Sequence, residues 1–200
     1  MEYCPLSSKI LVDEIAPKTT GGLITTTGIS NVLEQLAMLC DGGSYTVLSG
    51  TYTSTNVTAS QGLTTTYTTL PGSEISYTPP TGTTCVVYEF CFALAWTDSH
   101  SIGHYKFFID SDEAVYHRKS LGGTNSQQFV TAKSIIPIGG TADTNTGRQA
   151  SWTSAKTLKM QAREYGSGNE QKVFAATYWD GATNAMFQQP TLTITALGDA

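Results

Sequence analysis

From residue 44 onward, apolar and polar residues alternate with a period of two in short segments rich in Thr, aromatic and β-branched side chains. Gly, Pro, Asn and Asp separate these segments, and no second helical period interrupts them. About ten strands are predicted, over 44–53, 63–70, 73–78, 85–96, 104–109, 114–121, 127–138, 155–165, 172–179 and 190–197. Without βαβ alternation, this pattern predicts an all-β, antiparallel jelly-roll sandwich over 44–200.

The segment CVVYEFCFALAW, residues 85–96, has two apolar faces of different size. One face takes the large side chains of Val86, Tyr88, Phe90, Phe92, Leu94 and Trp96. The other takes the smaller set Val87, Glu89, Cys91, Ala93 and Ala95. A mostly apolar second face is typical of a strand that is covered on both sides or that faces another subunit. Val87 is therefore a candidate contact residue between copies.

One segment, residues 29–43, has helical spacing. Its apolar residues recur every three or four positions, at Ile29, Val32, Leu33, Leu36, Ala37 and Cys40. Glu34 lies three residues after Asn31, as in a capping box, and Gly42 and Gly43 suit a helix end. We expect an amphipathic helix that packs on its own sheet or lines a symmetry axis, with Leu33 and Leu36 as candidate oligomer contacts.

The first 28 residues differ from the rest of the chain. A short apolar segment with Ile10, Val12 and Ile15 is broken by Pro17 and by two glycines, so it buries little surface by itself. We expect an extended arm whose three apolar residues anchor it to a neighbouring subunit or a larger assembly, with a disordered tail as the alternative.

Charge and hydropathy limit the classes of partner. Charged residues make up 14% of the 200 residues, the formal net charge is −5, and no run of Lys or Arg occurs. Nucleic-acid binding, which depends on cations at phosphates, is therefore disfavoured. No segment reaches the ~18 apolar residues of a membrane-spanning helix, and the N-terminus lacks the apolar core of a signal peptide.

Four cysteines invite a test for disulfides. Cys85 and Cys91 lie about 20 Å apart if they share one extended strand, which is too far for a bridge. Cys4 and Cys40 can pair with each other, cross-link subunits or stay reduced. Free thiols are favoured because nothing in the sequence indicates an oxidising compartment, and no cysteine and histidine spacing suits structural zinc.

The stretch HSIGHYKFFIDSDEAVYH, residues 100–117, holds all three histidines. Alternation predicts a hairpin in which Tyr105, Phe107 and Ile109 face the core, with a return strand after a turn at 111–112. In an extended chain His100 and His104 lie ~13 Å apart, too far to share one zinc ion. The histidines are therefore not expected to act as one site.

The acidic turn of this hairpin is a weak candidate for calcium. Asp110, Asp112 and Glu113 offer carboxylate oxygens, but their spacing lacks the regular positions and the glycine of an EF-hand loop. A solvated turn is the simpler interpretation. No motif indicates an organic cofactor.

Catalysis is disfavoured. No Gly-x-Ser-x-Gly nucleophile turn occurs, and no spacing singles out the pair of carboxylates that a glycosidase requires. The remote alternative to a non-enzymatic role is a hydrolase of glycans that is carried on a larger particle. Arg148 and Trp152 are expected to serve loop packing or a polar contact.

Several segments together resemble a known family. LEQLAMLCDGGSYTV, SGTYT, GSEISYTPPTGTTCVVYEFCFAL and IGHYKFFIDSDE, followed by GGTADTNTGRQASWTSAKTLKMQAREY, resemble a virion protein of marine phages and large algal viruses. The resemblance covers residues 29–198. It implies a trimeric jelly roll similar to the complement globular head and tumour necrosis factor, with a structural or adhesive role and no catalytic residues. KILVDEIAPKTTGG resembles the leader of such domains in phage fibres, although the chain lacks a collagen-like stalk.

Two functional hypotheses follow. The first is a trimeric virion knob, assembled in the host cytoplasm, that decorates the capsid or belongs to a spike or fibre and contacts other virion proteins through its arm. The second is a host-attachment or carbohydrate-binding module, in which exposed aromatic residues stack on sugars or contact a receptor. The candidate aromatics are Trp96, Tyr165, Trp179 and Phe187, with Trp179 and Phe187 as the leading receptor contacts.

Overall fold

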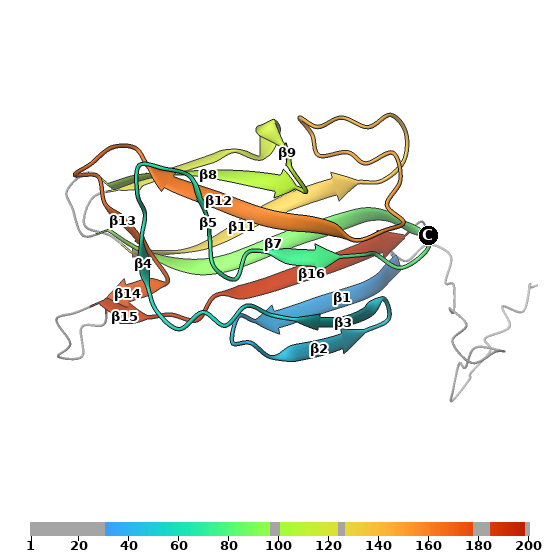
Figure 1. Cartoon of the computed structure of the whole chain (residues 1–200), viewed down its shortest axis with the longest axis horizontal. Helices are drawn as coiled ribbons and strands as arrows, with labels where there is room; N and C mark the ends of the chain where they lie inside the picture. Colours follow the sequence, from blue (N-terminus) through green and yellow to red (C-terminus); the bar gives the residue numbers. More distant parts are fainter. Residues whose placement is uncertain (1–30, 97–100, 124–126, 178–184, 199–200) are drawn as a thin grey trace, which may run out of the picture.

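The computed structural model describes residues 31–96, 101–123, 127–177 and 185–198. Two antiparallel sheets pack face to face over this part of the chain, which confirms the predicted all-β jelly-roll sandwich (Figure 1). The predicted arm over residues 1–28, including Ile10, Val12 and Ile15, lies outside the described residues, and so does Trp179.

The first sheet, here called the β7 sheet, is built around a fourteen-residue strand. Its strands are β1 (Asn31–Leu39), β16 (Thr191–Gly198), β7 (Thr83–Trp96), β13 (Gln171–Val173) and β4 (Gln61–Gly62), with β11 (Gln127–Pro137) paired to the other edge of β7. Pairing with β7 runs from Gln127 opposite Ala95 to Pro137 opposite Cys85. β7 is therefore the centre of this layer.

The second sheet, the β8 sheet, covers the inner face of the first. It contains β10 (Lys119–Gly123), β8 (Ser101–Ile109), β12 (Lys156–Glu164) and β5 (Thr68–Thr69), with β6 (Ile75–Tyr77) on β12 and β9 (Asp112–Glu113) on β8. Two hairpins flank the sandwich (Figure 1). These are β2 (Ser44–Val47) with β3 (Gly50–Thr53), and β14 (Ala175–Thr177) with β15 (Ala185–Phe187).

Aromatic side chains fill the space between the sheets. The rings of Tyr88 and Phe107 lie 4.9 Å apart, and those of Phe92 and Tyr105 lie 5.9 Å apart, so residues of β7 meet residues of β8 across the core. The predicted inward residues of β7 from Val86 to Leu94 are at most 2% exposed. Burial of each such side chain contributes about 1.5–3 kcal/mol, which makes this contact the main source of stability.

The predicted helix over 29–43 is wrong, because residues 31–39 form strand β1. β1 pairs along its length with β16, and a bulge between Val32 and Glu34 adds one residue to the strand. The bulge breaks the period-two alternation, and the resulting spacing imitates the three-and-four spacing of a helix. Leu36, Met38 and Cys40 then face the core.

The segment predicted as one strand over 172–179 is divided at Phe174. This residue has φ 62°, a conformation that is costly for a bulky side chain, and it separates β13 from β14. Its side chain is fully buried and packs edge-to-face against Phe90 and Phe92. The packing compensates the backbone cost and directs the chain out of the β7 sheet into the β14–β15 hairpin.

Candidate functional site

The outer face of the β7 sheet is the surface that points away from the β8 sheet. Hydrogen-bond register places its residues in rows that cross β11, β7, β16 and β1. The rows are Ile135, Val87, Thr195 and Gln35; Lys133, Glu89, Thr193 and Ala37; and Thr131, Cys91, Thr191 and Leu39. The surface thus consists mainly of aliphatic and threonine side chains.

Large apolar side chains stand exposed on this face. Phe129 is 78% exposed and Ile135 52% exposed on β11, while Val32 and Leu39 are about half exposed on β1. Charge on the three rows is confined to Lys133 and Glu89, whose Nζ and Oε1 atoms lie 3.2 Å apart as a neutralising pair. Such a concentration of apolar surface is typical of a face that another protein covers.

An apolar hollow of about 370 Å³ lies at the β1 side of this face. Its walls are Ala37, Met38, Leu39, Tyr45, Thr191 and Thr193. The Tyr45 hydroxyl accepts a hydrogen bond from the Leu39 amide at 3.1 Å, which occupies a backbone donor of β1 with a side chain of the β2–β3 hairpin. The hollow is therefore framed by two elements that are fixed to each other.

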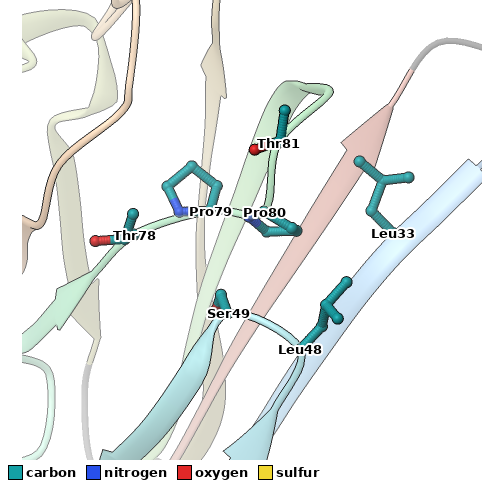
Figure 2. A pocket seen from close by; sticks show the side chains of 7 residues that line it. All are labelled: Leu33, Leu48, Ser49, Thr78, Pro79, Pro80 and Thr81. Carbon is teal, nitrogen blue, oxygen red and sulfur yellow. The ribbon is translucent and has the colours of Figure 1, made fainter. Parts of the chain in front are cut away.

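A second pocket, of about 440 Å³, opens beside the tip of the β2–β3 hairpin. Figure 2 shows Leu33 from the bulge and Leu48 from the hairpin turn on one side, with Pro79 and Pro80 on the other. Leu48 is 71% exposed. The lining is aliphatic and offers no acid, base or nucleophile beyond the hydroxyls of Ser49, Thr78 and Thr81.

A buried carboxylate holds the hairpin against this pocket. Glu34 is 6% exposed and accepts hydrogen bonds from the Ser49 amide at 2.6 Å, the Ser49 hydroxyl at 2.7 Å and the Tyr77 hydroxyl at 2.8 Å. Burial, and then the Glu34 contact, raise the pKa of Tyr77 far above its ordinary value, so the phenol stays a donor. Instead of closing a capping box, Glu34 joins β1, the hairpin turn and β6.

The predicted hairpin after residue 100 is confirmed in its first arm and wrong in its second. Tyr105, Phe107 and Ile109 of β8 are buried, as alternation predicted. The return begins with the two-residue β9 and a 3₁₀ turn over Val115–His117, and ladder pairing resumes with Lys119 opposite Tyr105. The turn at Asp110, with φ 56°, leads into this short return.

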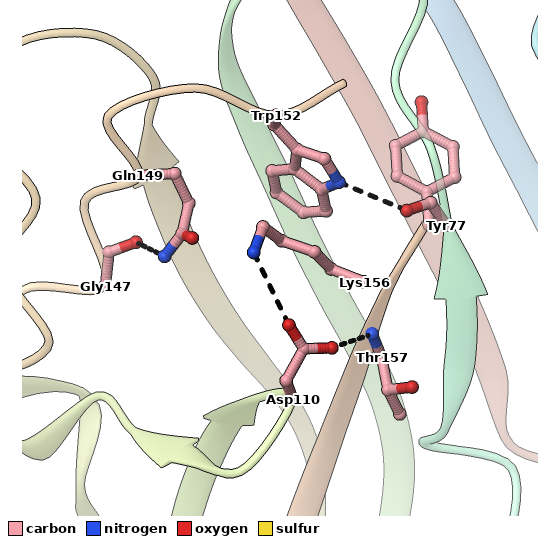
Figure 3. A network of polar contacts seen from close by, with 7 residues as sticks. All are labelled: Tyr77, Asp110, Gly147, Gln149, Trp152, Lys156 and Thr157. Atoms are coloured by element: carbon pink, nitrogen blue, oxygen red, sulfur yellow. Dashed lines mark hydrogen bonds and ion pairs between the residues drawn. The ribbon is translucent and has the colours of Figure 1, made fainter. Parts of the chain in front are cut away.

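Two of the three carboxylates in the proposed calcium turn, those of Asp110 and Glu113, already have partners within the protein. Asp110 accepts the Thr157 amide hydrogen at 2.8 Å and lies 3.4 Å from Lys156 Nζ (Figure 3). Glu113 bonds Lys106 at 2.9 Å and also Arg118, and these contacts lower its pKa. Within the described part of the chain, no three His, Cys, Asp or Glu residues form a group suited to a metal ion.

The two described histidines, His104 and His117, lie on opposite faces of the β8 sheet. His117 stacks on Phe107, with ring centroids 5.9 Å apart, and burial followed by the charge of Lys119 lowers its pKa. His104 lies on the opposite face of β8, where its ring is 6.1 Å from that of Tyr165. His100 lies outside the described residues. The two described histidines do not form a joint site.

The predicted contact residues have separate positions. Val87 lies in the centre of the outer face of the β7 sheet, and Leu33 lines the pocket of Figure 2. Leu36 is 1% exposed in the core of its own domain, so its assignment as an oligomer contact is wrong. Phe187 is half-buried against the core, which leaves little of its ring for a receptor. Tyr165, by contrast, is 63% exposed.

The described cysteines are free thiols. Cys40 is buried beside Gly72, and burial, followed by the nearby Asp41 charge, raises its thiol pKa to about 12. Cys85 and Cys91 are half-exposed on the outer face of the β7 sheet. The expectation that Cys85 and Cys91 do not bridge each other is confirmed, while Cys4 lies outside the described residues.

Arg148 and Trp152 were expected to serve loop packing or a polar contact, and their contacts agree with this expectation. Trp152 is 6% exposed, and its Nε1 donates to the Tyr77 carbonyl at 3.2 Å (Figure 3). Arg148 Nη1 donates to the Gly139 carbonyl at 3.1 Å. Neither residue lines a phosphate-binding loop.

Sequence reasoning missed Glu34 and Tyr67. The buried role of Glu34 depends on a bulge and on two distant partners, Ser49 and Tyr77, which no local pattern reveals. Tyr67 lies with its ring 4.4 Å from Lys106 Nζ and 5.3 Å from Arg163 Cζ, on the outer face of the β8 sheet. The sequence predicted a strand over 155–165, but its pairing with β5, which brings Tyr67 close to Arg163, is not visible in any local pattern.

Comparison with known proteins adds little beyond the fold. No protein-family model matches the chain, and no curated protein sequence matches it either. One solved structure that is similar in outline is that of infectious bursal disease virus, Gx strain, with 10% sequence identity and a TM-score of 0.38. The match covers 96% of this chain and 43% of the viral chain, so the present chain spans less than half the length of that protein.

In the described part of the chain, the search for a helix long and apolar enough to cross a membrane found none.

Proposed function

We propose that this chain is a non-enzymatic structural protein of a virus particle whose copies associate through the outer face of the β7 sheet. The observation on which the proposal depends is the chemistry of that face. Phe129 and Ile135 of β11, Val87 of β7 and Leu39 of β1 lie on this face, and the single ion pair on its three rows is neutral overall. Covering this surface with a second copy removes apolar area from water, which favours association.

The proposed assembly is a trimer anchored by the N-terminal arm. The resemblance of residues 29–198 to trimeric virion jelly rolls supports the number of copies, and the apolar segment around Val12 supports the anchor. Strand β1 begins at Asn31, opposite Gly198 of β16, and it is an edge strand of the same sheet that carries the apolar face. Oligomer contact and particle anchoring thus involve neighbouring parts of the chain.

Host attachment is the second candidate function, and one observation favours it. Tyr165 is 63% exposed beside His104, which gives an aromatic surface of the type that stacks on sugars. An adhesive role is compatible with a structural one, because Tyr165 follows β12 of the β8 sheet whereas the proposed subunit contact lies on the β7 sheet.

The experiment is incorporation into particles. Full-length chain and a variant lacking residues 1–28 are each supplied during infection, and purified virions are assayed for the protein. Full-length chain is expected in the particles, and the shortened chain is expected to keep its oligomeric mass in solution while failing to incorporate. Absence of the full-length chain from purified virions would contradict the structural role. Normal incorporation of the shortened chain would contradict the role of residues 1–28 as an anchor.

A further inference from the structure

The outer face of the β8 sheet has a charge opposite to that of the whole molecule. Strand register arranges its residues in three rows. The rows are Arg163, His104 and Ser120, with Tyr67 beside Arg163; Thr69, Gln161 and Lys106; and Lys159, Phe108 and Glu113. With Arg118 at the edge, four cations meet one carboxylate, giving +3 in a chain whose formal net charge is −5. This surface is here called the basic face.

The one carboxylate on the basic face is already engaged. Glu113 is 17% exposed, with one oxygen on Lys106 and the other on Arg118. Arg118 is 53% exposed and uses Nε for this contact, which leaves its terminal amino groups available to a ligand. Lys159 forms no ion pair with a carboxylate among the described residues. The face therefore keeps positive charge available for a ligand.

Tyr67 fixes the positions of two further cations. Lys106 and Arg163 both lie against its ring, and Arg163 Nη1 also donates to the Thr65 carbonyl at 3.4 Å. Arg163 Nε is buried and has no hydrogen-bond partner among the described residues. Cations held against an aromatic ring lose less freedom on binding an anion, because their side chains are already ordered.

A shallow pocket of about 210 Å³ lies between this cluster and strand β10. It is lined by Tyr67, His104, Tyr105, Arg118, Lys119 and Ser120. Beside it, the exposed ring of Tyr165 lies 6.1 Å from that of His104. The site thus combines two cations, hydroxyl groups and an aromatic surface, which is the set of groups that recognises a sugar ring with an acidic substituent.

We propose that the basic face binds an anionic polysaccharide, one whose sugar rings carry sulfate or carboxylate groups. Lys106 lies diagonally from both Arg163 and Lys159 on the neighbouring strand, which places these backbone positions about 8 Å apart. Lys106 and Arg163 share the Tyr67 ring, while Lys159 lies on a separate row, so the cations are distributed along the face rather than gathered around one acidic group. Neutral donors between the cations, Gln161 and Ser120, suit sugar hydroxyls. The inference names a ligand class for the second candidate function, with which it shares Tyr165, and it does not depend on the structural role.

Nucleic acid fits the same surface less well. A duplex presents one negative charge per about 1.7 Å of its axis, and its binding typically uses many more cations than four. The remainder of the chain carries a net negative charge that opposes a long, densely charged polymer. A polysaccharide with sparser charge meets the basic face without extending over the acidic surroundings.

The test uses full-length protein and fluorescent chondroitin sulfate, whose acidic groups lie on successive rings, with neutral dextran and duplex DNA as comparison ligands. Fluorescence anisotropy is expected to detect binding of chondroitin sulfate that weakens as salt is raised, and no binding of neutral dextran. The double variant Arg118→Gln, Lys159→Gln removes two charges from the basic face. Its dissociation constant is expected to rise about fivefold or more, as two exposed ionic contacts imply.

A matched double variant, Lys156→Gln with Lys172→Gln, removes the same charge elsewhere and is expected to bind as the native protein does. Thermal melting by circular dichroism checks that both double variants are folded. Tyr165→Ala tests the aromatic surface and is expected to weaken binding without changing its salt dependence. Three results would each overturn the proposal: equal losses of affinity in the two double variants, an unchanged dissociation constant in the Arg118 and Lys159 variant, or duplex DNA bound as tightly as chondroitin sulfate.

Discussion

The Tyr77 hydroxyl donates a hydrogen bond to Glu34 across the interior of the sandwich at 2.8 Å. This contact joins β6 of one sheet to the bulged strand β1 of the other, and Ser49 completes the carboxylate's bonds from the hairpin turn. A buried carboxylate is stable only when its oxygens are bonded in this way. The position of the hairpin, and with it the pocket of Figure 2, therefore depends on a polar contact.

We predict that Tyr77→Phe lowers the free energy of unfolding by about 1–3 kcal/mol, because it removes one bond from a buried charge. Glu34→Ala is expected to cost more, since it leaves the Ser49 and Tyr77 donors without their acceptor. Urea denaturation measures both. Tyr116→Phe is the matched control, as that ring is 73% exposed, and a loss in the control equal to that of Tyr77→Phe would contradict the assignment.

Acidification is expected to destabilise the protein through His117. Burial and Lys119 lower the pKa of His117 in the folded state below its ordinary 6.5. As the pH falls below 6.5, the unfolded chain takes up the proton first, so stability present above that pH is lost. Melting temperatures above and below pH 6.5 should show a smaller drop for His117→Gln than for the native protein. The control variant is His104→Gln. A drop in melting temperature for His117→Gln equal to that of the native protein would refute this prediction.

Thiol labelling should separate the cysteines by position. At mildly alkaline pH, Cys40 is expected to resist alkylation, because it is buried and its pKa is raised to about 12. Cys91 is half-exposed on the outer face of the β7 sheet, so the proposed association should protect it in the native oligomer. Peptide mapping by mass spectrometry reads each site. Rapid modification of Cys91 in the intact oligomer would argue against its burial between copies.

Calcium is not expected to stabilise the acidic turn. Asp110 already binds Lys156 and the Thr157 amide (Figure 3). Glu113 already binds Lys106, so added Ca²⁺ competes with existing contacts. Melting curves with added calcium and with a chelator are therefore expected to coincide. A calcium-dependent rise that is abolished by Asp112→Asn would show that the turn holds the ion.

Strands whose faces differ strongly were predictable from the sequence. β8 alternates buried and partly exposed side chains over its nine residues, β7 does so from Val86 to Phe92, and no bulge interrupts the pairing of β8 with β12. Tyr105 and Phe107 therefore occupy the faces that alternation assigns to them.

The features that could not be predicted from the sequence depend on pairing between strands that are far apart in the chain. Residues 31–39 become a strand because β16, some 160 positions later, offers a ladder partner, and the bulge at Leu33 gives them helix-like spacing. The basic face was hidden for a similar reason. Tyr67 and Lys106 belong to segments whose neighbourhood in the sheet depends on β12, which lies far from both in the chain.

The central claim is that copies meet through the outer face of the β7 sheet. The variant Ile135→Glu with Thr195→Glu places two negative charges on the row that contains Val87. The matched variant Thr69→Glu with Gln161→Glu places them on one row of the β8 sheet. Both should remain folded by circular dichroism, since all four positions are at the surface.

The measurement is the molar mass of each protein in solution by light scattering coupled to size exclusion. The native chain and the β8-sheet variant are expected at about three times the monomer mass, and the β7-sheet variant at the monomer mass. A native chain that elutes as a monomer, or a β7-sheet variant that stays at the native mass, would contradict the account.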